Sequence, residues 1–304
     1  MMNNNWITDK STKVLNITHD DLDGAVSAIV VSHVYPNCTT VKTNYSGQDF
    51  RNAIASINGM DYDAIVFSDF CPQREMLDAL RSVHKPYLVI DHHQTAEAHP
   101  EDPYGTFFIK EGRCGALLCY DYFKDMADLD NLYDLCVYTN DHDLWLRKLV
   151  PMSDDLNTLL YEYGYDNFIS KFYNGLGPDG SLDESSKALL ANHEHEVDEY
   201  IAGCVQKDLP YNGHYIECDT FNSDINLRMT PMYDWLVMAG TDGVDQGMTK
   251  LSFRTRRNDI NIGRVLKDLG RGGGGHPAAA GQVIPTAERD SFIQTVGDIL
   301  FGGK

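Results

Sequence analysis

The stretch that organises this sequence is Leu88-Val-Ile-Asp91-His92-His93-Gln94. Its apolar residues, together with Tyr87, predict a strand buried on both faces, and this strand ends abruptly in a carboxylate and two imidazoles. In an open parallel sheet, ligands collect beyond the carboxyl ends of the strands. We therefore expect the chemistry of the protein to lie at this point.

Three further apolar runs end in acidic residues or imidazoles. Carboxylates crowded into one crevice raise one another's pKa, so a cluster is tolerated mainly where a cation neutralises it. Mixed carboxylate and imidazole ligands suit manganese, iron, cobalt, zinc or magnesium better than calcium. The pattern predicts a two-metal centre. The three runs and the residues that follow them are 14–17 with His19, Asp21 and Asp23, 64–67 with Asp69, and 135–138 with Asp141 and Asp143.

Each acidic stretch alone also has a structural explanation. Residues 19–23 would present three side chains on one side if the strand stayed extended, but a turn at Leu22-Asp23-Gly24 equally predicts an Asx turn or a helix N-cap. Asp69 could merely cap the next helix. Asp141 and Asp143 fit a ligand, a helix stop or a partner of a ligand. The metal interpretation depends on the whole set.

Composition limits the class of protein. The chain has 304 residues, enough for two domains, and 42% hydrophobic residues support buried cores. Neither a membrane span nor a signal pattern is predicted, and the seven scattered cysteines lack a Cys-x-x-Cys pair, so we expect reduced thiols and a cytoplasmic protein. The net charge of −20 argues against long duplex nucleic acid as a partner but allows a small phosphorylated substrate.

The order of predicted elements indicates an α/β fold. Strands are expected at 13–18, 39–44, 62–68, 86–90 and 106–109, with helices at 24–33, 49–57 and 73–83 between them. This βαβ rhythm predicts a doubly wound, mostly parallel sheet. From Gly115 the pattern becomes helical, and a turn-rich segment at 174–180 marks a domain edge.

The second half of the chain predicts a smaller α/β domain facing the first across a cleft. Residues 181–207 form a linker helix, residues 1–180 the metal-binding domain, and residues 208–304 the smaller domain. Strands are expected at 213–221, 235–240 and 248–255, and helices at 262–269 and 287–301. Between those helices lies a glycine run, 270–281, whose backbone N–H groups suit an anion. Arg254 is directed toward it as a phosphate clamp or is merely a surface arginine.

In order and combination, these motifs resemble the DHH phosphoesterase superfamily with its C-terminal DHH-associated domain. The residues that carry the resemblance are His19-Asp-Asp21-Leu-Asp23-Gly24, Asp69, Asp91-His92-His93, Asp141 and Gly273-Gly-Gly-His276-Pro-Ala-Ala-Ala-Gly281. The first motif and the run Gln94-Thr95-Ala96 are most similar to those of the short-oligoribonucleotide exonucleases, or nanoRNases. The resemblance covers nearly the whole chain.

The resemblance implies a role for each motif residue. The metal ligands would be His19, Asp21, Asp23, Asp69, His92 and Asp141, with Asp141 preferred to Asp143. They would hold two divalent ions, Mn2+ first and Mg2+ or Co2+ as alternatives, which activate a water for attack on phosphorus. His93 would contact a phosphate oxygen or assist the leaving group, and Asp91 would orient an imidazole or complete a coordination shell. Arg254, His276 and the amides of Gly273, Gly274 and Gly275 would hold the other end of the substrate.

The implied activity is hydrolysis of short oligonucleotides or dinucleotides to mononucleotides by a metal-dependent phosphodiesterase. A first alternative keeps the metals and acts on adenosine bisphosphate, a cyclic dinucleotide or pyrophosphate. A second is a nucleotide sensor without turnover. No membrane partner is expected, and a homodimer is left open.

Overall fold

Two β-sheets organise the chain, one in each of two units. The computed structural model describes residues 4–302, and the chain divides into Met1–Leu190 (unit 1) and Ala191–Lys304 (unit 2). Each unit has its own hydrophobic cores. None of the helices within residues 4–302 is long and apolar enough to cross a membrane.

Unit 1 is built on a five-stranded parallel sheet in the order β2-β1-β3-β4-β5. This confirms the predicted parallel sheet. The order reverses between β1 and β3, and the ligand crevice of such a sheet lies outside the carboxyl ends of the strands at this point. The strands are β1 (Val14–His19), β2 (Cys38–Thr43), β3 (Ala64–Ser68), β4 (Tyr87–Asp91) and β5 (Gly105–Ile109).

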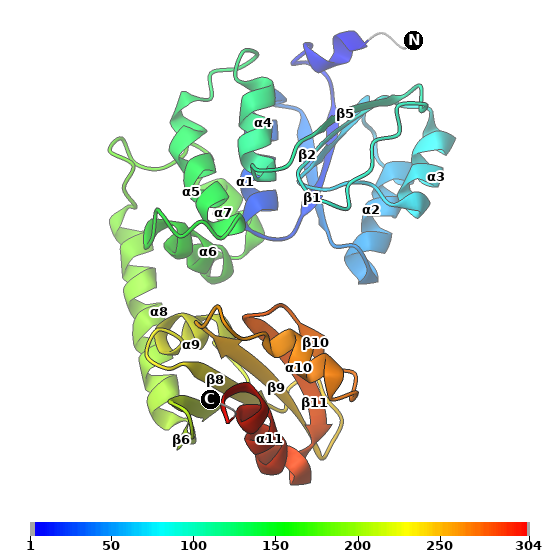
Figure 1. Cartoon of the computed structure of the whole chain (residues 1–304). Helices are drawn as coiled ribbons and strands as arrows, with labels where there is room; N and C mark the ends of the chain where they lie inside the picture. Colours follow the sequence, from blue (N-terminus) through cyan, green and yellow to red (C-terminus); the bar gives the residue numbers. More distant parts are fainter. Residues whose placement is uncertain (1–3, 303–304) are drawn as a thin grey trace. The chain divides into compact units, whose positions relative to one another are not determined.

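Helices cover both faces of this sheet, as expected of a doubly wound fold (Figure 1). In β4, Leu88 and Ile90 belong to the core shared with α1 and α4, whereas Tyr87 and Val89 belong to the core shared with α2 and α3. Successive side chains of a strand point to opposite faces, so two covered faces require a continuous apolar run. The helices are α1 (Leu22–Val34), α2 (Gly47–Gly59), α3 (Arg74–Val83) and α4 (Gly115–Phe123).

The chain turns directly from β1 into α1. Asp21 is the N-cap of α1 and accepts a hydrogen bond from the backbone N–H of Gly24 at 3.0 Å. A Cβ on Gly24 would lie 2.1 Å from the carbonyl oxygen of His19, so only glycine fits this turn. The strand therefore ends at His19 and Asp21 caps the helix, which is the second of the two structures that the sequence allowed.

Four further helices complete unit 1 and lead into unit 2. α5 (Tyr133–Asp143), α6 (Met152–Tyr163) and α7 (Tyr165–Lys171) enlarge the core on the α1 side of the sheet. The long helix α8 (Glu184–Gly203) begins in unit 1 and ends in unit 2. Short 3-10 turns lie at Asn4–Ile7, Asp130–Leu132 and Thr286–Glu288.

Unit 2 contains a six-stranded mixed sheet in the order β10-β11-β9-β8-β7-β6. β7 and β8 pair in parallel, and the other neighbours are antiparallel. One face packs on α10 and α11 and the other on α9 and the end of α8. The elements are β6 (Gln206–Leu209), β7 (Gly213–Glu217), α9 (Asn222–Met229), β8 (Trp235–Gly240), β9 (Met248–Thr255), α10 (Ile262–Asp268), β10 (Gly274–Gly275), β11 (Ala279–Pro285) and α11 (Arg289–Phe301).

The glycine run, for which the sequence predicted no strand, contributes to two strands of the sheet. It forms β10 and the beginning of β11, which pair with each other and, through β11, with β9. Ala280 and Ile284 are buried in the core of unit 2. Glycine and alanine have little strand propensity, so pairing with β9 and burial decide this conformation. β6 and α9 are also absent from the elements that the sequence predicts.

Candidate metal centre

Carboxyl ends of adjacent strands bring the predicted ligands together. His19 is the last residue of β1, Asp69 follows β3, and Asp91 is the last residue of β4. Asp69 has a left-handed backbone, with φ of 54°, and its N–H donates to the carbonyl of Ile90 at 2.9 Å. A non-glycine residue in this conformation is strained, and such residues concentrate at functional sites.

The first candidate site consists of His19, Asp21 and Asp69. One ligand atom from each residue lies within 4.8 Å of those of the other two. Nδ1 of His19 lies 2.6 Å from Oδ2 of Asp21, and this hydrogen bond raises the pKa of His19. Burial acts to raise the pKa of Asp21, but the hydrogen bond from His19, the charge of His19 and the hydrogen bond from the Gly24 N–H together outweigh burial and lower the pKa. The pair is thus stabilised in its charged form at neutral pH.

The second candidate site consists of Asp23, His92 and Asp143, whose ligand atoms also lie within 4.8 Å of one another. Nε2 of His92 lies 3.5 Å from an oxygen of Asp23 and 3.5 Å from an oxygen of Asp143. The same nitrogen lies 3.3 Å from Oδ1 of Asp69. Asp69 therefore connects the two candidate sites.

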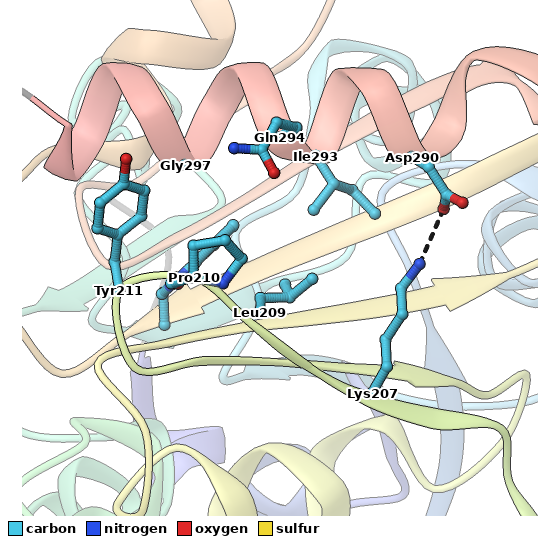
Figure 2. Close-up of a pocket in the computed structure, with 9 residues that line it drawn as sticks. Lys207, Leu209, Pro210, Tyr211, Asp290, Ile293, Gln294 and Gly297 are labelled. Carbon is cyan, nitrogen blue, oxygen red and sulfur yellow. Dashed lines mark hydrogen bonds and ion pairs between the residues drawn. The ribbon is translucent and has the colours of Figure 1, made fainter.

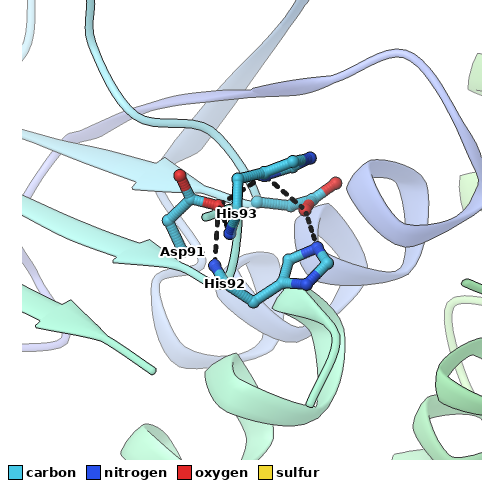
Figure 3. Close-up of side chains that lie close together, drawn as sticks. Asp91, His92 and His93 are labelled. Atoms are coloured by element: carbon cyan, nitrogen blue, oxygen red, sulfur yellow. Dashed lines mark hydrogen bonds and ion pairs between the residues drawn. The ribbon is translucent and has the colours of Figure 1, made fainter. Parts of the chain in front are cut away.

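Asp91 contacts the two histidines that follow it, as Figure 3 shows. Its Oδ1 accepts hydrogen bonds from the backbone N–H of His92 at 2.7 Å and from Nδ1 of His93 at 2.7 Å. The bond to Asp91 raises the pKa of His93. Asp91 is fully buried. Its position thus orients the His93 ring.

The donor set fits divalent cations. Buried atoms that lack a hydrogen-bond partner among residues 4–302 include both carboxylate oxygens of Asp69, Nε2 of His92 and Oδ2 of Asp143. Burial, followed by the neighbouring Asp23, raises the pKa of Asp69 well above its usual value, and the same two causes raise the pKa of Asp143 to about 8. Unpaired buried groups are costly, and bound cations would satisfy these ligands and neutralise their charge.

Asp23 is held by the beginning of α4. Its two oxygens accept hydrogen bonds from the backbone N–H groups of Gly115 at 2.6 Å and Ala116 at 2.7 Å. A Cβ on Gly115 would lie 2.5 Å from Cβ of Asp69. The N-terminus of α4 therefore packs directly against two predicted ligands. This contact has no local signal in the sequence, since it joins segments 92 residues apart.

Asp141 does not lie in either candidate site, which reverses the preference for Asp141 over Asp143. Its carboxylate accepts hydrogen bonds from the backbone N–H groups of Lys148 at 2.8 Å and Leu149 at 3.1 Å and from the Ser153 hydroxyl at 2.9 Å. Burial acts to raise the pKa of Asp141, but these bonds outweigh it and lower the pKa. The two acids lie on different sides of α5, and only the last residue of that helix faces His92.

The predicted substrate-binding residues of unit 2 lie at neighbouring positions in its sheet. Arg254 on β9 pairs in register with Ala279 on β11. The His276 N–H donates to the carbonyl of Ala279 at 2.8 Å, which closes the turn between β10 and β11. His276 is exposed and Arg254 is partly buried. Gly273, Gly274 and Gly275 lead into this turn, and Gly275 has a φ of 149° and no room for a Cβ beside Ala279 and Ala280.

One cavity lies in unit 1 and another in unit 2. One of about 700 Å³ borders unit 1's metal centre at Tyr45, whose ring centroid lies 6.2 Å from that of His93. The other, of about 210 Å³, lies in unit 2 between α11 and the turn after β6 (Figure 2). Lys207 and Asp290 pair at 3.1 Å along its edge, and Trp235 helps to line it.

Comparisons with known proteins agree with this fold. The DHHA1 domain family matches residues 227–300, and no curated protein matches the chain in sequence. The pGpG-specific phosphodiesterase PggH from Vibrio cholerae is 15% identical with a TM-score of 0.60, covering 93% of this chain and 97% of that chain. The DHH domain of a member of the s1p family of ribosomal proteins is 12% identical with a TM-score of 0.57, covering 95% and 86%.

The manganese complex of RecJ from Thermus thermophilus is 15% identical with a TM-score of 0.51. That alignment covers 95% of this chain but only 52% of RecJ. The parallel sheet of unit 1 thus combines a fold shared with these proteins and a cluster of carboxylates and imidazoles that fits divalent cations. The chain therefore carries a DHHA1 domain in unit 2, and it shares its fold with DHH-domain proteins.

Proposed function

We propose that the protein hydrolyses short oligonucleotides or dinucleotides to mononucleotides, using two divalent cations of which Mn2+ is the first candidate. The observation that carries the proposal is the pair of candidate sites, His19-Asp21-Asp69 and Asp23-His92-Asp143, connected by Asp69. A fold shared with a phosphodiesterase specific for the dinucleotide pGpG supports the substrate class. The manganese in the RecJ structure supports the metal.

Divalent ions at such a pair of sites supply a nucleophilic water at neutral pH and neutralise charge on the phosphate. The chain's own residues hold and orient the reactants. Both carboxylate oxygens of Asp69, Oδ2 of Asp143 and Nε2 of His92 have no competing hydrogen bonds among the described residues, so they are available as ligands. Asp23 is fixed by the N–H groups of α4, which limits the reorganisation needed on binding.

His93 is the group placed to move a proton. Because its Nδ1 faces Asp91, its Nε2 is the nitrogen that remains for a substrate. Hydrolysis forms a bond from water oxygen to phosphorus and breaks the bond from phosphorus to the leaving ribose oxygen. A protonated His93, favoured by its raised pKa, would donate to that leaving oxygen or to a phosphate oxygen.

Unit 2 would bind the rest of the substrate through the β10–β11 turn. Arg254 supplies a guanidinium for a phosphate, and His276 and the preceding glycine amides supply further donors. The net charge of −20 makes extended duplexes poor partners, whereas small anions are neutralised locally. The proposal includes a cytoplasmic location, supported by seven free cysteines, which suit a reducing compartment.

The deciding experiment is a substrate panel with Mn2+. It should compare short RNA, short DNA, cyclic dinucleotides, adenosine bisphosphate and pyrophosphate, with formation of mononucleotides from the short oligomers as the expected result. Asp69→Ala and His92→Ala should abolish turnover. Asp61 and His195 are exposed and belong to neither candidate site, so Asp61→Ala and His195→Ala are matched controls that should leave turnover unchanged.

Each other result of the panel has a defined meaning. Preferential release of phosphate from adenosine bisphosphate or pyrophosphate would replace the proposed substrate and retain the metal centre. Binding of nucleotides without turnover of any of them would indicate a sensor. Full metal-dependent activity in Asp69→Ala would refute the assignment of the metal centre to these residues.

A further inference from the structure

The loop that follows α5 presents apolar side chains to solvent beside the metal centre. It spans residues 144–150 and begins directly after Asp143, which is the last residue of α5. Trp145 is 58% exposed and Leu146 is 41% exposed. Leu149 and Val150 of the same loop are also exposed, and contiguous exposed apolar residues, unlike single ones, mark interaction sites.

Hydrogen bonds to the end of α5 hold the backbone of this loop. The buried Asp141 accepts hydrogen bonds from the backbone N–H groups of Lys148 and Leu149. The N–H of Trp145 donates to the carbonyl of His142 at 3.0 Å, and the N–H of Leu146 donates to the carbonyl of Asp141 at 2.9 Å. The exposed side chains thus sit on a backbone that is held in one conformation.

The conformation itself is unfavourable. Trp145 and Arg147 both have left-handed backbones, with φ of 53° and 58°. Neither is a glycine, so the surrounding hydrogen bonds must maintain the strain, and strain of this kind persists mainly where it positions a functional group. This backbone conformation sets the direction of the Trp145 indole, and Trp145 follows the candidate ligand Asp143 by only two residues.

The surroundings of the indole suit a flat aromatic ligand. The Arg147 guanidinium carbon lies 4.7 Å from the centroid of the Trp145 ring, and Arg147 is also paired with Asp154. The ring centroid of His142 lies 6.4 Å from that of Trp145 in an edge arrangement, and Trp145 is nevertheless more than half exposed to solvent. Aromatic side chains beside a cation are the usual platform on which nucleic-acid bases stack.

We propose that Trp145 stacks on a nucleobase of the substrate and thereby positions the adjacent phosphodiester at the metal centre. The inference rests on the proposed function, which it extends by assigning a base-recognition residue in unit 1. Asp141 is then a positioning residue, because it holds the loop that carries Trp145 and does not itself contact the substrate. The chemical class of ligand is a purine or pyrimidine base attached to a phosphate.

Binding to the Mn2+-loaded full chain gives the first test. Adenosine 5′-monophosphate should quench tryptophan fluorescence, whereas ribose 5-phosphate, which lacks the base, should not. In Trp145→Phe the quenching should disappear, because the remaining tryptophans, Trp6 and Trp235, are not expected to contact the base. Equal quenching in the wild type and in Trp145→Phe would overturn the proposal.

Turnover gives the second test, with diadenylate and its two singly abasic analogues as substrates. Trp145→Ala should raise KM for diadenylate by about tenfold, a typical loss for one stacked base, with a smaller change in kcat. Trp145→Phe should restore much of the affinity, and the exposed Tyr161 gives the control Tyr161→Ala, which should have no effect. Removing one base from the substrate should raise KM for the wild type but not for Trp145→Ala.

The outcomes separate this inference from the proposed function. If the wild type cleaves diadenylate but Trp145→Ala discriminates against the abasic analogues as strongly as the wild type does, stacking on Trp145 is refuted. If Trp145→Ala instead alters the sedimentation coefficient, the exposed loop is a surface for a second copy and the inference fails. If no dinucleotide is cleaved, the proposed function fails, whereas quenching that depends on Trp145 would still support the base site.

Discussion

Oδ1 of Asp91 accepts a hydrogen bond from Nδ1 of His93 at 2.7 Å, and Asp91 is fully buried. The carboxylate therefore sets both the orientation and the proton affinity of the imidazole, because a hydrogen bond to the charged partner favours the imidazolium form. This relationship leaves the other nitrogen of His93 for the substrate, and it makes the pH dependence of the reaction a test of the site.

Asp91→Asn should lower the pKa of His93 and reduce kcat about 10- to 100-fold, which is the usual effect of removing a carboxylate that orients an imidazole. If protonated His93 donates to the leaving group, activity falls as pH rises through the pKa of His93, and this fall should move to lower pH in the variant. The pH–rate profile of kcat measures the shift. A profile of unchanged shape would exclude His93 as the proton donor.

Asp143→Asn should mainly affect metal binding, whereas Asp141→Asn should mainly affect stability. Asp143 faces His92 with an unpartnered oxygen, so its replacement should weaken Mn2+ binding, as measured by isothermal titration calorimetry. Asp141 accepts three hydrogen bonds, so its replacement should lower the free energy of unfolding by about 1–3 kcal/mol. Loss of Mn2+ binding only in Asp141→Asn would restore the assignment that the sequence favoured.

The metal-free protein should become less stable as pH rises from about 4 to 8. The raised pKa of Asp69 and of Asp143, to about 8 for the latter, means that the folded state binds more protons than the unfolded state over this range. The raised pKa values of His19 and His93 act in the same direction, because their stabilisation is lost as pH rises through those values.

Calorimetry in a chelating buffer at pH 5 to 8 measures this dependence as a decreasing Tm. Mn2+ should raise Tm more at pH 8 than at pH 5, because protons compete with the cation for the carboxylates. Asp143→Asn should reduce the slope of Tm against pH without metal. A Tm that stays constant over this range would contradict the crowding of acids described for the site.

Gly115→Ala should distort the metal centre. The new Cβ would lie 2.5 Å from Cβ and 2.8 Å from Cα of Asp69, so either α4 or Asp69 must move. We expect a loss of about 1–3 kcal/mol in the free energy of unfolding, together with weaker Mn2+ binding. Gly59, at the end of α2, has open space where a Cβ would lie, with no atom of the described residues within 4 Å, so Gly59→Ala is the matched control. Equal stability and Mn2+ binding in both variants would show that α4 does not support the site.

Much of the fold could be predicted from the sequence because its signals are local. Continuous apolar runs such as Leu88–Ile90 require a strand covered on both faces, and the alternation of such runs with amphipathic helices specifies a parallel sheet. β8 and β9 lie at the predicted residues, 235–240 and 248–255. β11 was not predicted, because alanine and glycine become a strand only through pairing with β9.

The sequence by itself determined that acids and imidazoles follow the strands of an α/β sheet, because parallel strands place their carboxyl ends at one edge. Only the tertiary structure decided which of two acids on α5 faces His92, since Asp141 and Asp143 are alike in type and differ only in direction from the helix axis. It alone also joined the N–H groups of Gly115 and Ala116 to Asp23 and held Trp145 in a strained, exposed position. These contacts connect distant segments, and the packing that creates them leaves no local signal in the chain.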